Sequence, residues 1–229
     1  MTSLRIVCLS DTHGLHGQAR VPDGDLLLHA GDLTGRGREP ELLASFDWLR
    51  SLPHPHKVVI AGNHDFALEH PSPRIRRALE GLNYLRDEAV TLEGLTIYGS
   101  PWQPWFYDWA FNLRRGPELQ GVWARIPEHT DILITHGPPL GICDRTERGE
   151  AVGCADLLER VRQVRPKLHL FGHIHEAYGS EVQGETLFLN ACLCDLSYRP
   201  CQPPFVVLWD GQRMSLSKDF DMPQTKPIR

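Results

Sequence analysis

The stretch LRIVCLSDTHG, residues 4–14, joins a short apolar run to polar side chains that follow it at once. Its apolar part, residues 4–9, has the length of a buried strand and is too short for a helix of ordinary size. Further short apolar runs stop in the same way at a glycine or a polar residue: residues 26–30, 58–61, 132–134 and 168–171. The sequence therefore predicts a set of buried strands.

Helices and hairpins are predicted around these strands. Apolar side chains recur at helical spacing in some of the intervening segments, and Gly-containing turns separate pairs of short strands in others. A βαβ unit at the start of the chain, followed by hairpins, predicts an α/β fold in which two sheets pack together with helices outside. Helices are expected over residues 39–52, 73–82 and 153–164, and hairpin turns at Glu93-Gly94, Gly184-Glu185 and Asp210-Gly211.

Length and composition indicate an ordinary globular protein. The chain has 229 residues, which suits a single domain over residues 1–220 with a loose tail over residues 221–229. The net charge of −5 argues against strong nucleic-acid binding. Without a signal peptide or a long apolar run, we expect a cytoplasmic protein with no membrane association. The cysteines form no C-x-x-C pair, which argues against a disulfide framework. The sequence does not indicate the oligomeric state.

Residue types that bind metals follow five of the predicted strands directly. In sheets with helical crossovers, functional groups gather beyond the carboxyl ends of the strands, so these side chains can meet in one site. Mixed oxygen and imidazole ligands suit Mn²⁺, Fe, Zn²⁺ or Ni²⁺ better than Ca²⁺. The candidate metal ligands are Asp11, His13, Asp32, Asn63, His136, His173 and His175.

A pair of divalent cations at such a site is suited to hydrolysis of a phosphate ester. Asp32 has two oxygens and can bridge cations that lie roughly 3.5–4 Å apart in two-metal sites. Such a pair attracts an anionic phosphate and lowers the pKa of a shared water. His64 is the candidate catalytic residue, as a donor to the leaving oxygen or to a phosphoryl oxygen. Asp65 either orients His64 or caps a helix that begins near Phe66.

Five motifs carry a resemblance to a known family: SDTHG at 10–14, AGDLT at 30–34, GNHD at 62–65, THGPP at 135–139 and GHIH at 172–175. Together they resemble the calcineurin-like metallophosphoesterase superfamily, and residues 98–104 and 168–176 look like its MPPED-type subgroup. The resemblance implies a metallophosphoesterase domain built as a four-layer αββα sandwich of two mixed β-sheets flanked by helices. It also implies two divalent transition-metal ions, with Mn favoured over Fe, Zn, Ni or Co. One would be held by Asp11, His13, Asp32 and His175, and the other by Asp32, Asn63, His136 and His173.

Because this ligand set is complete, we expect a working enzyme. The expected function is a metal-dependent phosphoesterase in which a hydroxide that bridges two metals hydrolyses phosphodiesters, with cyclic nucleotides or similar small diesters as leading substrates. A phosphomonoesterase or nuclease of the same superfamily is the alternative enzyme. An inactive binding scaffold is the alternative of another class. Residues 31–37 lack the Asp-Arg-Gly that follows the second motif in Ser/Thr protein phosphatases, so that activity ranks lower.

Some residues stay open between structural and functional roles. Segment 101–121 shows little periodicity and is expected to be a long structured loop; its aromatic residues either fill the core or stack on a base, and the core is favoured. His29 and His169 lie in apolar strands, either as core residues or as partners of metal ligands. The remaining expectations are a less favoured zinc site at Cys192, Cys194 and Cys201, which lacks a fourth ligand, and a solvated face at Arg114 and Arg115.

Overall fold

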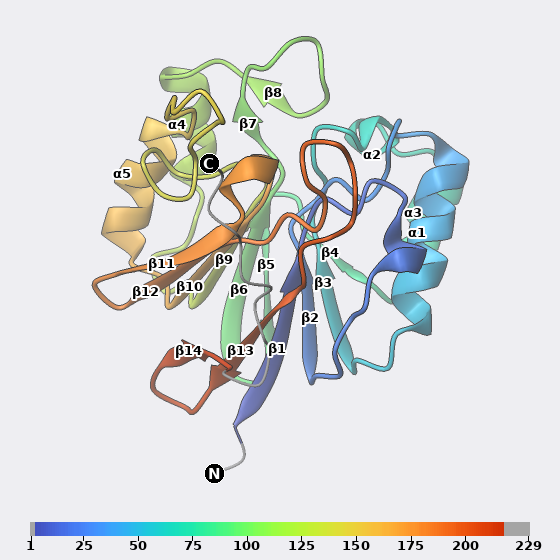
Figure 1. The fold of residues 1–229 in the computed structure, drawn as a ribbon, viewed down its shortest axis with the longest axis horizontal. Helices are drawn as coiled ribbons and strands as arrows, with labels where there is room; N and C mark the ends of the chain where they lie inside the picture. Colours follow the sequence, from blue (N-terminus) through green and yellow to red (C-terminus); the bar gives the residue numbers. More distant parts are fainter. Residues whose placement is uncertain (1–2, 218–229) are drawn as a thin grey trace, which may run out of the picture.

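The computed structural model describes residues 3–217, and two large β-sheets dominate it (Figure 1). The first sheet has the strand order β14-β13-β1-β2-β3-β4. Strands β1 to β4 run parallel, whereas β13 and β14 extend the sheet as antiparallel strands. The bounds are β1 (Leu4–Leu9), β2 (Leu26–His29), β3 (His56–Val59), β4 (Asn83–Tyr84), β13 (Phe205–Trp209) and β14 (Met214–Leu216).

The second sheet has the strand order β11-β12-β10-β9-β6-β5. Its four central strands run parallel, and the hairpin partners β5 and β11 lie at its edges as antiparallel strands. A separate pair of short strands, β7 (Gln103–Pro104) and β8 (Asn112–Leu113), lies above it in Figure 1. The bounds are β5 (Glu88–Leu92), β6 (Leu95–Ser100), β9 (Ile132–Thr135), β10 (Leu168–Phe171), β11 (Gly179–Gln183) and β12 (Thr186–Asn190).

Side chains of the central strands alternate between two faces, because successive residues of a strand point to opposite sides. In β1, Ile6 belongs to the core between the sheets and Val7 to the cluster under the first helical layer. In β9, Leu133 packs in the cluster under the other helices. The four layers confirm the expected sandwich of two mixed sheets. The flanking helices are α1 (Glu39–Ser51), α3 (Pro73–Ala78), α4 (Pro117–Trp123) and α5 (Ala155–Val164).

Two helices differ from the sequence-based expectation. Helix α3 ends at Ala78 and not at residue 82, because the chain turns at Gly81, with φ of 83°, to enter β4. Helix α4 lies in a segment that was expected to be a loop; Pro117 stands in its first turn and Leu119 is buried beneath it. The tail expected at residues 221–229 lies outside the described residues. No helix within residues 3–217 has the length and apolar character needed to cross a membrane.

Candidate metal centre

The loops that follow β1, β2, β3, β9 and β10 meet at one edge of the two sheets (Figure 1). Backbone hydrogen bonds join them: the N–H of Asp11 donates to the carbonyl of Gly31 at 3.0 Å, and that of Gly172 donates to the carbonyl of His136 at 2.9 Å. The backbone is left-handed at several candidate ligands, with φ of 54° at Asp11, 55° at Asp32 and 70° at His173. Strained backbone of this kind persists where surrounding bonds over-determine it, and it clusters at functional sites.

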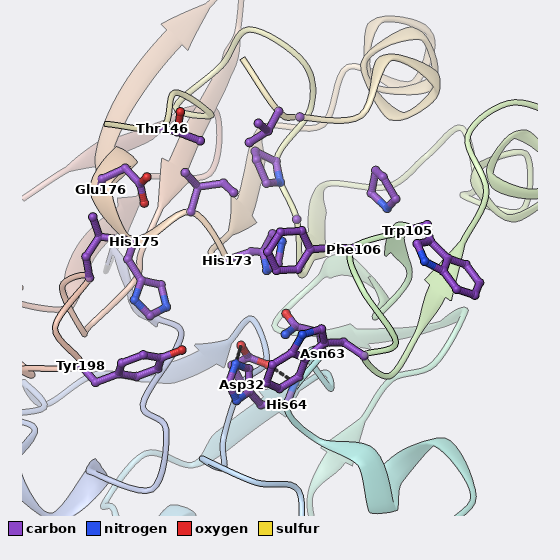
Figure 2. Close-up of a pocket in the computed structure, with 18 of the residues that line it drawn as sticks. Asp32, Asn63, His64, Trp105, Phe106, Thr146, His173, His175, Glu176 and Tyr198 are labelled. Atoms are coloured by element: carbon purple, nitrogen blue, oxygen red, sulfur yellow. Dashed lines mark hydrogen bonds and ion pairs between the residues drawn. The ribbon is translucent and has the colours of Figure 1, made fainter. Parts of the chain in front are cut away.

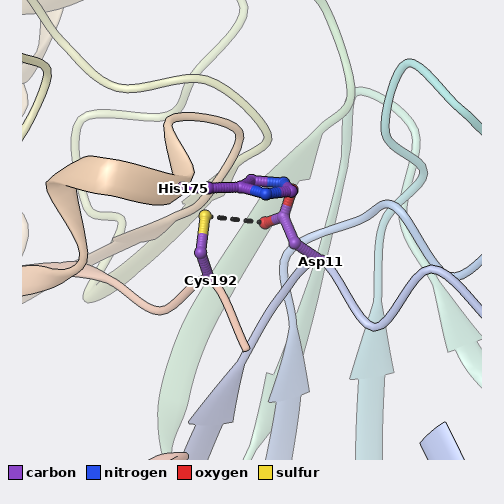
Figure 3. Close-up of side chains that lie close together, drawn as sticks. All are labelled: Asp11, His175 and Cys192. Atoms are coloured by element: carbon purple, nitrogen blue, oxygen red, sulfur yellow. Dashed lines mark hydrogen bonds and ion pairs between the residues drawn. The ribbon is translucent and has the colours of Figure 1, made fainter. Parts of the chain in front are cut away.

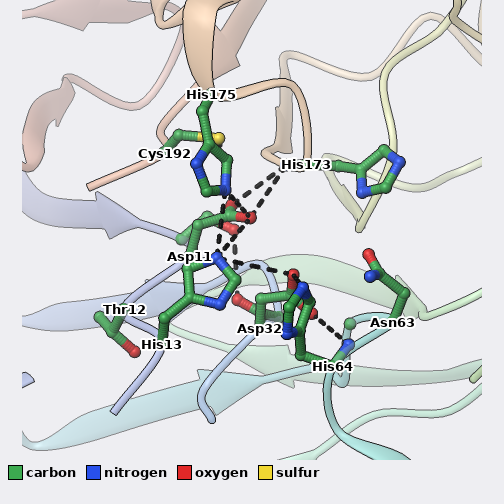
Figure 4. A network of polar contacts seen from close by, with 12 residues as sticks. Asp11, Thr12, His13, Asp32, Asn63, His64, His173, His175 and Cys192 are labelled. Atoms are coloured by element: carbon green, nitrogen blue, oxygen red, sulfur yellow. Dashed lines mark hydrogen bonds and ion pairs between the residues drawn. The ribbon is translucent and has the colours of Figure 1, made fainter. Parts of the chain in front are cut away.

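Asp11 lies between two histidines (Figure 4). Its Oδ1 is 3.7 Å from Nε2 of His13 and 3.4 Å from Nε2 of His175, and the two Nε2 atoms are 3.1 Å apart. Its Oδ2 accepts a hydrogen bond from the backbone N–H of His173 at 3.1 Å. A single cation can therefore reach donor atoms of Asp11, His13 and His175 together.

Asp32 lies beside a second group of donors. Its Oδ2 is 3.4 Å from Nε2 of His136 and 3.8 Å from Nε2 of His13, so this carboxylate is within reach of both groups, as a bridging role requires. Oδ1 of Asn63 is 2.9 Å from Nε2 of His136. The ring of His173 packs edge-on against that of His136, with centroids 5.0 Å apart. The structure thus brings the candidate ligands together at one site.

Backbone carbonyl groups fix the direction of two imidazole rings. Nδ1 of His136 is 2.9 Å from the carbonyl oxygen of Ala30, and Nδ1 of His175 is 3.0 Å from that of Asp195. A carbonyl only accepts, so each Nδ1 carries the proton. Each Nε2 faces the carboxylates, and in the neutral ring it offers its lone pair to a cation that lies between them. Metal-binding histidines are commonly oriented in this way through their other nitrogen.

The charges of the cluster fit a cation. Burial alone would lower the pKa of His136, but Asp32 outweighs burial and raises that pKa to about 9. Burial is likewise outweighed at His175, where Asp11 raises the pKa to about 9. Burial would raise the pKa of Asp32, but His136 and other histidines hold it below its usual range. Two buried carboxylates thus attract positive charge to a set of ring nitrogens, and this donor set suits divalent transition-metal ions.

The buried thiol of Cys192 contacts Asp11, a contact that the sequence did not reveal (Figure 3). Sγ donates to Oδ2 of Asp11 at 3.2 Å, while the other carboxylate oxygen faces the histidines. Burial, followed by the charge of Asp11, raises the pKa of this thiol well above its usual range, which keeps the donor proton on sulfur. Within residues 3–217, Cys194 and Cys201 join no group of potential metal ligands, so the three-cysteine zinc site does not form.

Cys192→Ala is expected to weaken Mn²⁺ binding about tenfold, because Asp11 loses a group that fixes its orientation. Cys192→Ser keeps a donor and should bind Mn²⁺ more nearly as the wild type does. Titration calorimetry measures both affinities. Cys194→Ala is the matched control, since Cys194 is equally buried and makes no hydrogen bond to Asp11. Equal weakening by Cys194→Ala, or none by Cys192→Ala, contradicts this role.

Asp65 stands at the N-cap position of the short helix α2 (Phe66–Glu69), but its side chain makes no cap hydrogen bond there and none to the ring of His64. Its carboxylate accepts hydrogen bonds from the backbone N–H groups of Thr34, at 3.1 Å, and Gly62, at 2.9 Å. Asp65 therefore holds the loop after β2 against the loop after β3.

His29 and His169, whose roles the sequence leaves undecided, also support loops that carry candidate ligands. Nε2 of His29 lies 3.1 Å from Oγ1 of Thr12, and Nε2 of His169 lies 2.9 Å from Oγ1 of Thr135.

A pocket of about 450 Å³ opens beside the cluster (Figure 2). Asp32 and His173 line it on the side of the cluster, and aromatic side chains of segment 101–121 line it elsewhere. Trp105 and Phe106 are 56% and 48% exposed, so for these two residues the expectation of a core role is wrong. Phe111 of the same segment is buried and does belong to the core.

Arg115 is exposed, as its sequence context predicts, and it also lines the pocket. Its guanidinium donates to the carbonyl oxygens of Val152 and Gly153, both at 2.8 Å. These two bonds hold the exposed side chain against the loop before α5. The pocket therefore carries a fixed cation on its wall.

The comparisons with known proteins agree with this site and fold. A family model described as calcineurin-like phosphoesterase matches residues 4–177. Human and mouse metallophosphoesterase domain-containing protein 1 are each 45% identical over 228 residues, which cover 89% of this chain and 70% of theirs. A UPF0046 protein of Caenorhabditis elegans is 40% identical, and the match covers 89% of this chain and 80% of that protein. The solved structure of TT1561 of Thermus thermophilus has a TM-score of 0.60 at 14% identity, covering 94% of this chain and 99% of that one, and supports the fold alone.

Proposed function

The chain belongs to the calcineurin-like phosphoesterase family, and on this basis we propose that it is a metal-dependent phosphodiesterase that acts on small diesters, with cyclic nucleotides as leading candidates. The observation that supports this most strongly is the convergence of two buried carboxylates and several histidines beside a pocket. Buried titratable groups with shifted pKa values, gathered beside a cleft, are the mark of a candidate functional site.

The donor set suits two divalent transition-metal ions, with Mn²⁺ favoured. When bound, such ions supply positive charge that attracts the phosphate ester and activates water for attack on phosphorus. The chain orients the imidazole donors through backbone carbonyl groups, and backbone N–H groups hold the carboxylates of Asp11 and Asp32 in place. We assign one ion to Asp11, His13, Asp32 and His175, and the other to Asp32, Asn63, His136 and His173.

The pocket walls favour a diester over a monoester. A monoester carries a second negative charge, which an additional free cation would stabilise. Among the described residues that line the pocket, Arg115 is the only lysine or arginine, and two backbone carbonyls already hold its guanidinium. The exposed rings of Trp105 and Phe106 offer apolar surface to an organic group on the second ester oxygen.

His64 is placed to assist the leaving group. Its Nδ1 lies 2.8 Å from the carbonyl oxygen of Gly35 and therefore carries a proton. Its Nε2 lies 4.0 Å from Oδ2 of Asp32, and the residue lines the pocket. The ring of Trp109 packs against His64 with centroids 4.2 Å apart and limits its movement. When protonated, His64 donates from Nε2 to the leaving oxygen as the ester bond breaks.

His64→Ala should slow hydrolysis by about 10²–10⁴-fold for diesters with poor leaving groups, the range expected for loss of a general acid. The loss should be much smaller for p-nitrophenyl esters, because their leaving group is stable without a proton. Measuring kcat across a leaving-group series tests this. His129→Ala, at an exposed histidine outside the pocket, is the control. An equal loss across the series would remove the acid role.

The proposed function is tested with purified protein, metal analysis and a substrate panel. The panel holds cyclic nucleotides, a linear diester such as bis-p-nitrophenyl phosphate, and a matched monoester. We expect hydrolysis of diesters that needs Mn²⁺ and stops when the metal is chelated. Turnover of the monoester alone would establish the phosphomonoesterase alternative. Tight metal binding with no turnover at all would establish the scaffold alternative.

We also propose that the protein works in the cytoplasm. Its cysteines are all free, at Cys8, Cys143, Cys154, Cys192, Cys194 and Cys201. Free thiols in this number suit a reducing compartment. Cell fractionation checks the location directly.

A further inference from the structure

A closed turn over residues 195–199 stands beside the metal-ligand cluster. The carboxylate of Asp195 accepts hydrogen bonds from the backbone N–H groups of Ser197 and Arg199, at 2.9 and 3.0 Å. It also accepts a bond from Nε of Arg199 at 2.8 Å. The N–H of Tyr198 donates to the carbonyl oxygen of Asp195, again at 2.8 Å. These bonds fix the position of Tyr198 within the turn.

The same turn is joined to a candidate metal ligand. The carbonyl oxygen of Asp195 that accepts from Tyr198 also accepts from Nδ1 of His175, at 3.0 Å. Tyr198 has a φ of 56°, which is strained for a bulky residue and is held here by the bonds of the turn. The tyrosine is therefore presented in a fixed place relative to the imidazole of His175.

The ring of Tyr198 lies against the cluster with its hydroxyl turned into the pocket (Figure 2). Its centroid is 4.8 Å from that of the His13 ring and 5.4 Å from that of the His175 ring, both edge-on. Tyr198 is nevertheless 48% exposed. No group within residues 3–217 accepts a hydrogen bond from its hydroxyl, so this donor is available to a ligand in the pocket.

We propose that Tyr198 contacts the substrate and that its hydroxyl donates a hydrogen bond to a non-reacting oxygen of the phosphoryl group. This inference rests on the proposed function. A phenol has an ordinary pKa of about 10 and so carries its proton at neutral pH. Donors directed at phosphoryl oxygens stabilise the charge that is redistributed in the transition state.

Tyr198 and His64 act on different oxygens of the ester in this arrangement. Their ring centroids are 6.2 Å apart, and both residues line the pocket. His64 serves the leaving oxygen, whose need for a proton depends on the leaving group. Tyr198 serves an oxygen that stays on phosphorus, so its contribution should not depend on the leaving group. The two roles are therefore separable by kinetics.

Tyr198→Phe removes the hydroxyl and keeps the ring. We expect kcat/KM for a diester to fall about tenfold to a hundredfold, by a similar factor for good and poor leaving groups, with unchanged Mn²⁺ affinity. Tyr107→Phe is the matched control. Tyr107 is also an exposed tyrosine with positive φ, at 72% exposure and 49°, but it does not line the pocket. This control should retain the turnover of the wild type.

Binding of orthophosphate gives a readout that needs no turnover. In calorimetry with Mn²⁺-loaded protein, Tyr198→Phe should bind orthophosphate about tenfold more weakly than the wild type or Tyr107→Phe. If the wild type binds orthophosphate but cleaves no diester, the proposed function fails, while weaker binding by Tyr198→Phe still supports the role of the hydroxyl.

Three results would overturn the role of Tyr198. The first is equal phosphate affinity and equal turnover in Tyr198→Phe and the wild type. The second is a loss of turnover accompanied by an equal loss of Mn²⁺ affinity, because the effect would then act through the turn and His175. The third is a wild type that neither binds orthophosphate nor cleaves any ester, which also contradicts the proposed function.

Discussion

Asp32→Asn is expected to lower the kcat/KM of metal-dependent phosphodiester hydrolysis by about 10³-fold or more. Asp32 lies within reach of both groups of candidate ligands, since its Oδ2 is 3.4 Å from Nε2 of His136 and 3.8 Å from Nε2 of His13. Asparagine removes the negative charge and replaces one oxygen by a donor that repels a cation. A bound metal supplies several kcal/mol of transition-state stabilisation, and about 4 kcal/mol corresponds to a thousandfold.

The fold should survive this substitution. The backbone N–H of His64 donates to Oδ1 of Asp32 at 2.8 Å, and the amide oxygen of asparagine can accept the same bond. Kinetics with Mn²⁺ and thermal unfolding, measured on one preparation, separate activity from stability. Asp47→Asn is the control, because its side chain is 81% exposed on α1, away from the site. Wild-type turnover in Asp32→Asn would falsify the site assignment.

Gly172→Ala should damage the metal centre without changing any ligand. A Cβ atom at Gly172 would lie 1.9 Å from Oδ2 of Asp11 and 2.3 Å from Oγ of Ser10. Asp11 cannot easily yield, since the N–H of His173 and the thiol of Cys192 hold the same oxygen. We expect Mn²⁺ affinity to fall about 10–100-fold. The free energy of unfolding should fall by about 1–3 kcal/mol, the usual cost of overpacking.

Calorimetry with Mn²⁺ measures the first effect of Gly172→Ala, and urea unfolding with the metal chelated measures the second. Gly121→Ala is the matched control: Gly121 lies in α4, and its Cβ would meet no atom within 4 Å. Alanine there should leave metal binding unchanged and can add up to about 1 kcal/mol of helix stability. Wild-type Mn²⁺ affinity in Gly172→Ala would show that Asp11 is not held as described.

Much of the fold could be predicted because its signals are local. The run at residues 4–9 forms β1 with the expected bounds, and its neighbours in the sheet are also short apolar runs. The turn at Glu93-Gly94 does connect a hairpin, with Leu92 opposite Leu95. The candidate ligands follow strand ends, and parallel strands bring such ends to one edge of a sheet. Their convergence therefore followed from the strand pattern and the motifs together.

The aromatic segment shows why other features could not be predicted. Trp105 is exposed in the pocket, whereas Phe111 is fully buried six positions later. Both are large apolar residues in a segment without periodicity, so composition does not separate them. Trp105 directly follows β7 and Phe111 directly precedes β8, so the two rings lie on either side of a strand pairing that no local pattern signals. Pro117 with Leu119 and Val122 at helical spacing was the signal available for α4.

The amino-acid sequence alone determined the alternation of each strand and the metal-binding residue types at its end, because these features depend on neighbours only a few positions apart. Only the tertiary structure placed Cys192 against Asp11, across 181 positions of sequence, and Tyr198 against His13. Such contacts arise where loops of two packed sheets meet. No local pattern encodes them, since they depend on how the whole core brings distant strand ends together.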